Sequence, residues 1–410
     1  MIFTTGVFAL FFALVLPLYW VLPPRARKYL LIVAGMVFYA YYYVPYLVVV
    51  LVMTILTYIA ALAILKARDG AGSSKGRARV WLFVGVAASV LVLGYFKYWK
   101  MLVSTWNELA SRIHMGHPAP VPDILVPMAI SFFTFEFIHF VSDVYLGKID
   151  RETVKVPDFA LFIFFFPTLV SGPIKRYQGF QKQSQSMPEF ALDNLLGGGK
   201  RVILGLAQKF ILADTIGRLA APLAAPEAWS AQMLAFAAYA YAFKIYFDFA
   251  GYSDMAIGLA QMLGFKVPEN FDRPYFQPNI AQFWRHWHMS LSSWIRDYLY
   301  IPLGGSRLGF ARTLANLIAA FAICGLWHGA AWNFVAWGLW HGFGMVGHRI
   351  WHRYLGQRLA RFGTPVHFFN VFLTFNFVVA GWVLFASPSL SAAALTYAKL
   401  AGACARLIGL

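Results

Sequence analysis

The sequence predicts an all-α polytopic membrane protein. Of its 410 residues, 60% are hydrophobic and only 12% are charged. Apolar stretches recur at lengths of about 17–25 residues, which a helix needs to cross the roughly 30 Å hydrocarbon layer of a bilayer. A water-soluble domain could not bury that much apolar surface, so the composition excludes one. We therefore expect residues 1–410 to form a single integral membrane domain.

The expected elements follow from the order of the apolar stretches, which indicate roughly 10–12 crossings plus re-entrant and interfacial helices. The first stretch lacks a basic start and a small-residue cleavage site, so we expect a retained span and not a signal peptide. Segment 158–171 is apolar but short and interrupted by Pro167, which is typical of a re-entrant or half-membrane element. Crossing helices are expected near 3–22, 29–44, 46–65, 80–104, 124–146, 200–222 and 230–250, within 313–347, and near 367–387 and 391–410.

The charges of the loops predict an orientation. The net charge is +17, from 34 Lys and Arg against 17 Asp and Glu. The basic residues gather in alternate loops, at 23–28, 66–79 and 147–157. The positive-inside rule then places the N-terminus outside and these loops in the cytoplasm. This pattern makes membrane lipid, and not nucleic acid, the expected partner. A later basic group is expected to be cytoplasmic as well: Arg349, Arg353, Arg358 and Arg361.

A polar stretch interrupts the hydropathy between Pro268 and Arg312. Pro268, Pro274 and Pro278 prevent a continuous helix before Asn279, which is a plausible N-cap, and one helix is expected from there to Tyr300. His288 lies at the edge of its apolar stripe and His286 on its polar face, so the period favours His288 as the inward-facing residue. The helix is expected to lie in the headgroup region, because a basic, Ser-rich face opposes a stripe formed by Trp284, Trp287, Leu291, Trp294, Ile295 and Tyr298.

The segment LWHGAAWN, residues 326–333, places His328 in a long apolar stretch. An ionisable side chain there is costly unless it lines a cavity or has a polar partner, and it is functional by default. Imidazole changes protonation near neutral pH, so His328 is a candidate general base. A second Trp-His-Gly places His341 about 220° away on an unbroken helix. Helical geometry does not choose between the two histidines.

Four motifs occur in order between about 125 and 345. They are FFPTLVSGPIKRY, YFDFAGYSDMAIGLAQMLGF, NFDRPYFQPNIAQFWRHWHMSLSSWIRDYLYIPLGGSR and GLWHGAAWNFVAWGLWHG. On these motifs the chain resembles the membrane-bound O-acyltransferase (MBOAT) family. Within that family it resembles the bacterial branch with the alginate O-acetyltransferase membrane subunit and the teichoic-acid D-alanyl transfer protein. The resemblance implies many tilted helices around a central funnel, in the bacterial cytoplasmic membrane.

The resemblance also implies residue roles. It makes His328 the catalytic residue and His288 the second histidine of the family. His286 stands where relatives commonly carry another basic residue, so the second role is assigned to His288 and not to His286.

The implied reaction is acyl transfer, with no bound cofactor, from a cytoplasmic thioester to a polysaccharide hydroxyl outside. The donor is acetyl-CoA or a phosphopantetheinylated acyl carrier protein, and a periplasmic SGNH-type protein often completes the transfer. Such chemistry needs a deprotonated nucleophile and a stabilised oxyanion. His328 meets the first need. Indole N–H groups such as that of Trp327, the amide of Asn333, or His288 are candidates for the second.

Four charged residues are further binding candidates, each with an ordinary structural alternative. Lys175 and Arg176 are expected to meet the phosphates of the donor, or to be ordinary cytoplasmic charges. Asp248 and Asp254 are expected to line the tunnel, or to pair with basic side chains.

Two acids on the span 124–146, Glu136 and Asp143, are expected to pair with neighbouring polar groups. Cys324 lies one helical turn before His328, where an acyl-enzyme is conceivable, but a small core residue is the favoured interpretation. Cys324 and Cys404 have no metal-ligand spacing, so no metal site is expected.

Three functions remain open at this point. The first is an O-acetyltransferase for a secreted or cell-surface polysaccharide. The second is transfer of D-alanine from a carrier protein to teichoic acid. The third is a non-enzymatic acyl conduit or transporter whose histidines line a pore.

Overall fold

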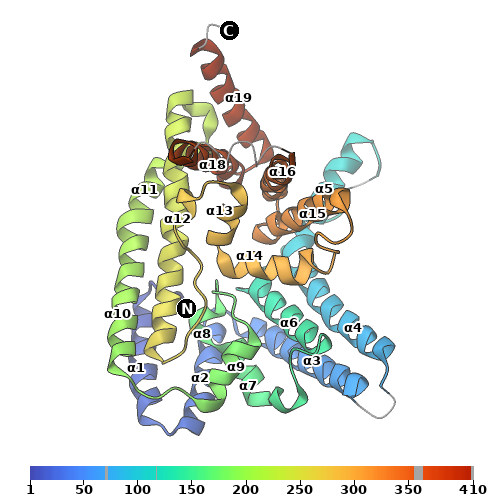
Figure 1. Ribbon diagram of the computed structural model, residues 1–410, viewed down its shortest axis with the longest axis vertical. Helices are drawn as coiled ribbons and strands as arrows, with labels where there is room; N and C mark the ends of the chain where they lie inside the picture. The colour runs from blue at the N-terminus through green and yellow to red at the C-terminus, as the bar shows by residue number, and fades with distance from the viewer. Residues whose placement is uncertain (70–72, 117, 355–362, 408–410) are drawn as a thin grey trace. The chain divides into compact units, whose positions relative to one another are not determined.

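The computed structural model describes residues 1–69, 73–116, 118–354 and 363–407, and in this part of the chain the regular structure is helical (Figure 1). One isolated antiparallel bridge joins Phe271 to Trp287. The predicted all-α class is confirmed. Arg358 and Arg361 of the predicted cytoplasmic basic group lie outside the described residues.

The chain divides into two compact units. One comprises Met1–Ile203 with Ser253–Pro268, and the other comprises Leu204–Tyr252 with Glu269–Leu410. Two helices, α10 (Leu192–Ala207) and α12 (Ala231–Met262), contribute residues to both units.

The first unit is a bundle in which α3, α4 and α6 pack against one another and α2 packs on α7. Its short apolar segment forms α7 and α8, which are buried. The break falls at Phe165, and Pro167 lies in the first turn of α8, where a missing N–H costs nothing. Besides parts of α10 and α12, its helices are α1 (Gly6–Val21), α2 (Pro24–Ala40), α3 (Val44–Asp69), α4 (Lys75–Leu93), η1 (Gly94–Tyr98), α5 (Trp99–Arg112), α6 (Ile130–Tyr145), η2 (Arg151–Thr153), α7 (Val156–Phe164), α8 (Phe166–Leu169) and α9 (Tyr177–Ser186).

The second unit is built around the helix pair α15 (Phe310–His328) and α16 (Trp332–Tyr354). Two glycines let these helices approach closely. A Cβ on Gly325 would lie 2.2 Å from the Phe334 carbonyl oxygen, and one on Gly338 would lie 2.2 Å from that of Phe321. The other helices are η3 (Gln208–Ala213), α11 (Asp214–Leu219), η4 (Ala221–Ala224), η5 (Pro226–Ala228), η6 (Pro274–Phe276), α13 (Ile280–His286), α14 (Met289–Ile295), η7 (Arg296–Tyr300), α18 (Gly363–Ala386) and α19 (Leu390–Leu407).

The prediction of one helix from Asn279 to Tyr300 is wrong. Asn279 does cap a helix, because its side chain accepts a hydrogen bond from the Gln282 N–H at 2.9 Å. That helix, α13, ends at His286, and α14 runs in a different direction from Met289 (Figure 1). The Trp stripe is also not a lipid-facing surface, since Trp284 and Trp287 are buried among rings of the protein.

Four of the described helices are long and apolar enough to cross a membrane, judged by length and composition: Val44–Asp69, Lys75–Arg112, Phe310–His328 and Val366–Ala386. These helices make the chain a multi-pass membrane protein. The total of 10–12 crossings stays a prediction.

The contact between α15 and α16 predicts the effect of adding one methyl group to α16. Gly338→Ala drives a Cβ into the Phe321 carbonyl, so we expect it to lower the free energy of unfolding by about 1–3 kcal/mol. Gly347→Ala is the matched control, because its Cβ has no neighbour within 4 Å, and a helical alanine is favoured over glycine by about 0.5–1 kcal/mol. Thermal unfolding in detergent measures both. Equal melting temperatures for the two variants would contradict the close approach.

Candidate active site

A sharp turn between α13 and α14 places His288. Its φ is +43°, the left-handed region that costs a non-glycine residue of order 1–3 kcal/mol and persists only when the surroundings fix it. The extended segment before α13, around Asn270–Asp272, holds this turn in place by hydrogen bonds. Asp272 N–H donates to the His286 carbonyl at 3.1 Å, and Met289 N–H donates to the Asn270 carbonyl at 2.9 Å. The buried Ser290 hydroxyl also donates to the Asn270 side chain, at 2.7 Å.

This turn points the His288 ring into the protein, as the period predicted. Its side chain is 2% exposed. The ring lies edge-on to Phe249 at 4.5 Å and 6.2 Å from the ring of Trp327, measured between centroids. The ring of His328 is 6.5 Å away. The two histidines singled out by the sequence therefore lie next to each other in the second unit.

His328 is the last residue of α15 and is half-buried. Its ring is surrounded by aromatic rings, with centroid distances of 4.8 Å to Trp327, 5.0 Å to Trp337 and 5.3 Å to Phe385.

His341 joins the same cluster through Trp337. Because the chain turns between α15 and α16, both histidines contact this tryptophan, each with a centroid distance of 5.0 Å. The Trp284 ring packs edge-on to His341 at 5.1 Å, and the Trp382 ring stacks on Trp337 at 5.7 Å. We call His288, His328, His341 and the tryptophans 284, 327, 337 and 382 the histidine cluster.

Several polar atoms of this cluster have no hydrogen-bond partner among the described residues. They are Nε2 of His288, both ring nitrogens of His341, and the indole nitrogens of Trp284 and Trp337. Buried polar groups are almost always paired, so an unpaired set in one place is typical of a functional site. Burial, and secondly the neighbouring His328, hold the pKa of His288 well below its usual value. His288 is thus a neutral imidazole near pH 7.

The two residues near His328 that were predicted to bind substrate have different surroundings. Trp327 lies in the cluster, with its ring against both His288 and His328. Asn333 is buried in the first turn of α16, and its amide nitrogen donates to the carbonyls of Leu384 and Ser387 at 3.2 and 3.0 Å. Both amide hydrogens are used there, so Asn333 joins α16 to the end of α18 and has no donor left for an oxyanion.

The predicted phosphate-binding residues lie in the first unit. Lys175 is buried and forms an ion pair with Glu136, with its ammonium 4.5 Å from the Phe162 ring centroid. A phosphate would have to displace that carboxylate. Arg176 follows at the start of α9 and is half-buried. Asp143 pairs with Lys148 at 3.0 Å and accepts from Gln178 at 2.6 Å. The predicted pairing of Glu136 and Asp143 is confirmed.

The two acids predicted to line the tunnel, Asp248 and Asp254, also form ion pairs. Asp248 lies between Lys244 at 2.7 Å and Lys209 at 2.9 Å. Asp254 binds Arg201 at 2.7 Å. Both acids are therefore paired with basic side chains, which was the structural alternative to a role in substrate binding. His286 is partly exposed and its Nδ1 lies 2.8 Å from the Gln282 carbonyl oxygen, outside the cluster. Cys324 is a buried free thiol on α15, as expected of a small core residue.

The sequence left open whether His341 lies beside His328, and it did not identify Trp284 or Trp382 as neighbours of the histidines. A packing histidine is expected to be hydrogen-bonded, and neither ring nitrogen of His341 has a partner within the described chain. The sequence feature that could have revealed this proximity is Gly329. It follows the last residue of α15, where the chain turns back toward α16.

The chain is similar to known proteins over most of its length. Residues 146–387 match the family described as MBOAT, membrane-bound O-acyltransferase family. The probable alginate O-acetylase of Pseudomonas aeruginosa is 39% identical over 395 residues, covering 96% of this chain and 73% of that protein. The peptidoglycan O-acetyltransferase of Helicobacter pylori is 33% identical, with 90% and 73% covered. The teichoic acid D-alanyltransferase of Bacillus subtilis is 31% identical, with 74% and 78% covered.

A variant of Ser290 tests whether its hydrogen bond to Asn270 stabilises the left-handed turn at His288. We expect Ser290→Ala to lower the free energy of unfolding by about 1–2 kcal/mol, because it leaves the buried Asn270 oxygen without this donor. The control is Ser293→Ala, whose hydroxyl bonds only the Ser290 carbonyl of its own helical turn in the described structure. Thermal unfolding of both variants in detergent gives the difference. A smaller loss for Ser290→Ala than for the control would show that this hydrogen bond does not fix the turn.

Proposed function

The chain belongs to the membrane-bound O-acyltransferase family and is an acyltransferase, and from this we propose that it transfers an acetyl group from a thioester donor to a hydroxyl, for O-acetylation of a secreted or cell-surface polysaccharide. His328 is the proposed general base. The third alternative, a non-enzymatic conduit, does not fit a chain whose relatives carry acyltransferase names over most of its length.

The observation that carries this proposal is the pair of histidine rings. His288 and His328 lie 6.5 Å apart, centroid to centroid, among tryptophans whose N–H groups include unpaired ones. Aromatic surroundings exclude water, so a charge that develops there is poorly screened and each nearby donor or acceptor has a large effect. A packing role for two adjacent imidazoles explains none of the unpaired atoms.

The proposed step needs one proton transfer in each direction. The imidazole of His328 accepts the hydroxyl proton as the oxygen attacks the thioester carbonyl carbon. The C–O bond forms, the C–S bond then breaks, and the proton passes from the imidazolium to the leaving sulfur, which departs as a thiol. The balance is one ester and one thiol from one alcohol and one thioester, with no oxidant or metal.

The oxyanion of the tetrahedral intermediate needs preorganised donors. The indole N–H of Trp337 is the first candidate, because its ring contacts His328 and its nitrogen has no partner within the described chain. A neutral His288 with its proton on Nε2 is the second, since that nitrogen is also unpaired. Asn333 is excluded by its two carbonyl contacts.

Similarity favours acetyl over D-alanyl transfer. The alginate O-acetylase and the peptidoglycan O-acetyltransferase described above match 96% and 90% of this chain at 39% and 33% identity, whereas the D-alanyltransferase of Bacillus subtilis matches 74% at 31%. Transfer of D-alanine from a carrier protein to teichoic acid stays the second candidate. The proposed setting is the bacterial cytoplasmic membrane, with the N-terminus outside and a periplasmic SGNH-type protein as relay. The donor is acetyl-CoA or an acylated carrier.

Removal of His328 tests the proposal. With labelled acetyl-CoA and purified protein in lipid vesicles, we expect His328→Ala to lower acyl transfer about 10²–10⁴-fold, as the loss of a general base does. His286→Ala is the control, because this histidine lies outside the cluster. Normal transfer by His328→Ala would refute the role of the base. Label transfer from an acylated carrier protein, and none from acetyl-CoA, would select the carrier-bound donor.

The indole N–H of Trp337 has its own test. Trp337→Phe keeps an aromatic ring and removes the donor, so we expect kcat to fall about a hundredfold with KM little changed. Trp340→Phe is the matched control, since the Trp340 N–H donates to the Phe377 carbonyl at 3.0 Å and is not part of the cluster. If the two variants lose kcat equally, Trp337 acts through packing alone.

A further inference from the structure

Trp382 of α18 is the tryptophan of the histidine cluster that stacks on Trp337. It is 1% exposed, and the two rings lie 5.7 Å apart between centroids with an angle of 19° between their planes. The ring of Trp287 lies 5.0 Å from it, and Phe385 lies edge-on at 5.5 Å. Trp337 in turn lies edge-on to His328. Closely packed rings cannot turn independently, so the plane of Trp382 constrains the plane of Trp337 and the direction of its N–H.

A single hydroxyl group orients the Trp382 ring. The indole N–H of Trp382 donates to the Tyr275 hydroxyl oxygen at 3.2 Å, and that hydroxyl donates to the Ala242 carbonyl of α12 at 2.6 Å. A carbonyl oxygen can only accept, so the hydroxyl proton is directed toward Ala242 and an oxygen lone pair is left for the indole. The indole nitrogens of Trp284 and Trp337 are unpaired within the described chain, whereas that of Trp382 has this partner. The hydrogen bond thus fixes the tryptophan that stacks on Trp337.

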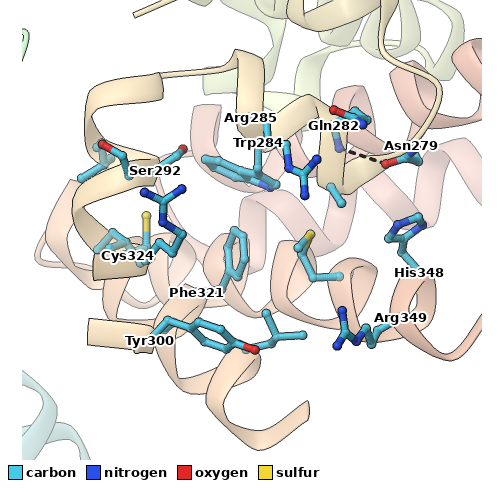
Figure 2. A pocket seen from close by; sticks show the side chains of 18 of the residues that line it. Asn279, Gln282, Trp284, Arg285, Ser292, Tyr300, Phe321, Cys324, His348 and Arg349 are labelled. Carbon is cyan, nitrogen blue, oxygen red and sulfur yellow. Dashed lines mark hydrogen bonds between the residues drawn. The ribbon is translucent and has the colours of Figure 1, made fainter. Parts of the chain in front are cut away.

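The ring of Tyr275 is held by rings from two helices. It is nearly parallel to Phe283 of α13, with centroids 6.2 Å apart, and lies edge-on to Phe375 of α18 at 5.1 Å. Phe283 follows the cap of α13, in which the Asn279 side chain accepts from the Gln282 N–H. Figure 2 shows this cap in the lining of a pocket of 720 Å³. Because packing holds the ring, a phenylalanine would fit the same place, and only the hydroxyl is specific to tyrosine.

We propose that Tyr275 is a positioning residue for the acyl-transfer step. Its hydroxyl holds Trp382 in one plane, and Trp382 in turn holds the N–H of Trp337 in the direction that the oxyanion requires. Removal of the hydroxyl leaves the buried N–H of Trp382 without a partner, and the ring turns toward another acceptor. Catalytic donors must be preorganised to act on a developing charge, so a small rotation of Trp337 slows transfer. The effect on the rate rests on the proposed function, whereas the orientation of the two rings does not.

The orientation of the rings is tested without turnover. Full-length protein with an isotopic label on its indole nitrogens is measured by NMR in detergent, and Trp337→Phe and Trp382→Phe assign the two signals. We expect Tyr275→Phe to shift both, because Trp382 loses its acceptor and Trp337 loses the fixed ring on which it stacks. The control is Tyr239→Phe, whose hydroxyl also joins α12 to α18, through the Asn376 side chain, and is not part of the cluster. Equal shifts in the two variants, or an unmoved Trp337 signal in Tyr275→Phe, overturn the proposal.

Kinetics test the consequence for transfer. In lipid vesicles, Tyr275→Phe is expected to lower kcat about three- to tenfold, the effect of one hydrogen bond, with KM little changed. In a Trp382→Phe background the same change is expected to have almost no further effect, because the N–H that the hydroxyl accepts is already absent. Losses that multiply would show that Tyr275 acts independently of Trp382 and would overturn the proposal. If His328→Ala transfers normally, the proposed base is wrong, whereas the indole spectra still decide whether Tyr275 orients the rings.

Discussion

The close contact of α15 and α16 is the constraint on which the candidate site depends. Gly325 and Gly338 bring two helix backbones together where any side chain would collide with a carbonyl. This approach places Trp337 against the last residue of α15, so one indole ring touches both His328 and His341. Asn333 then binds the end of α18 to the same helix pair.

The aromatic walls have an electrostatic effect as well as a packing one. An imidazole surrounded by indole and phenyl rings has few competing hydrogen bonds. Its pKa is therefore sensitive to burial and to any nearby charge. His288 illustrates this, because burial alone is the main cause of its lowered pKa. The two histidines therefore differ in character. His328 is half-buried at the end of α15, whereas His288 is almost fully buried and its pKa is held well below the usual value.

Much of the fold could be predicted from the sequence, because apolar length and helical period are local properties. The all-α class and the broken element around Pro167 followed from them. His288 does face inward, but its prediction assumed one continuous helix that the structure does not have. The break at His288 could not be predicted, since it is held by Asn270, about twenty residues earlier. The relative position of His328 and His341 could not be predicted, because it depends on the turn between α15 and α16. The roles of Asn333 and Lys175 depend on carbonyls and carboxylates from other helices, which no local pattern reveals.

The left-handed turn at His288 also bears on how such a chain can evolve. Most side chains are penalised at φ +43°, whereas asparagine enters this region several-fold more often. A histidine codon becomes an asparagine codon by a single base change. The backbone thus tolerates a substitution that erases the imidazole and keeps the turn.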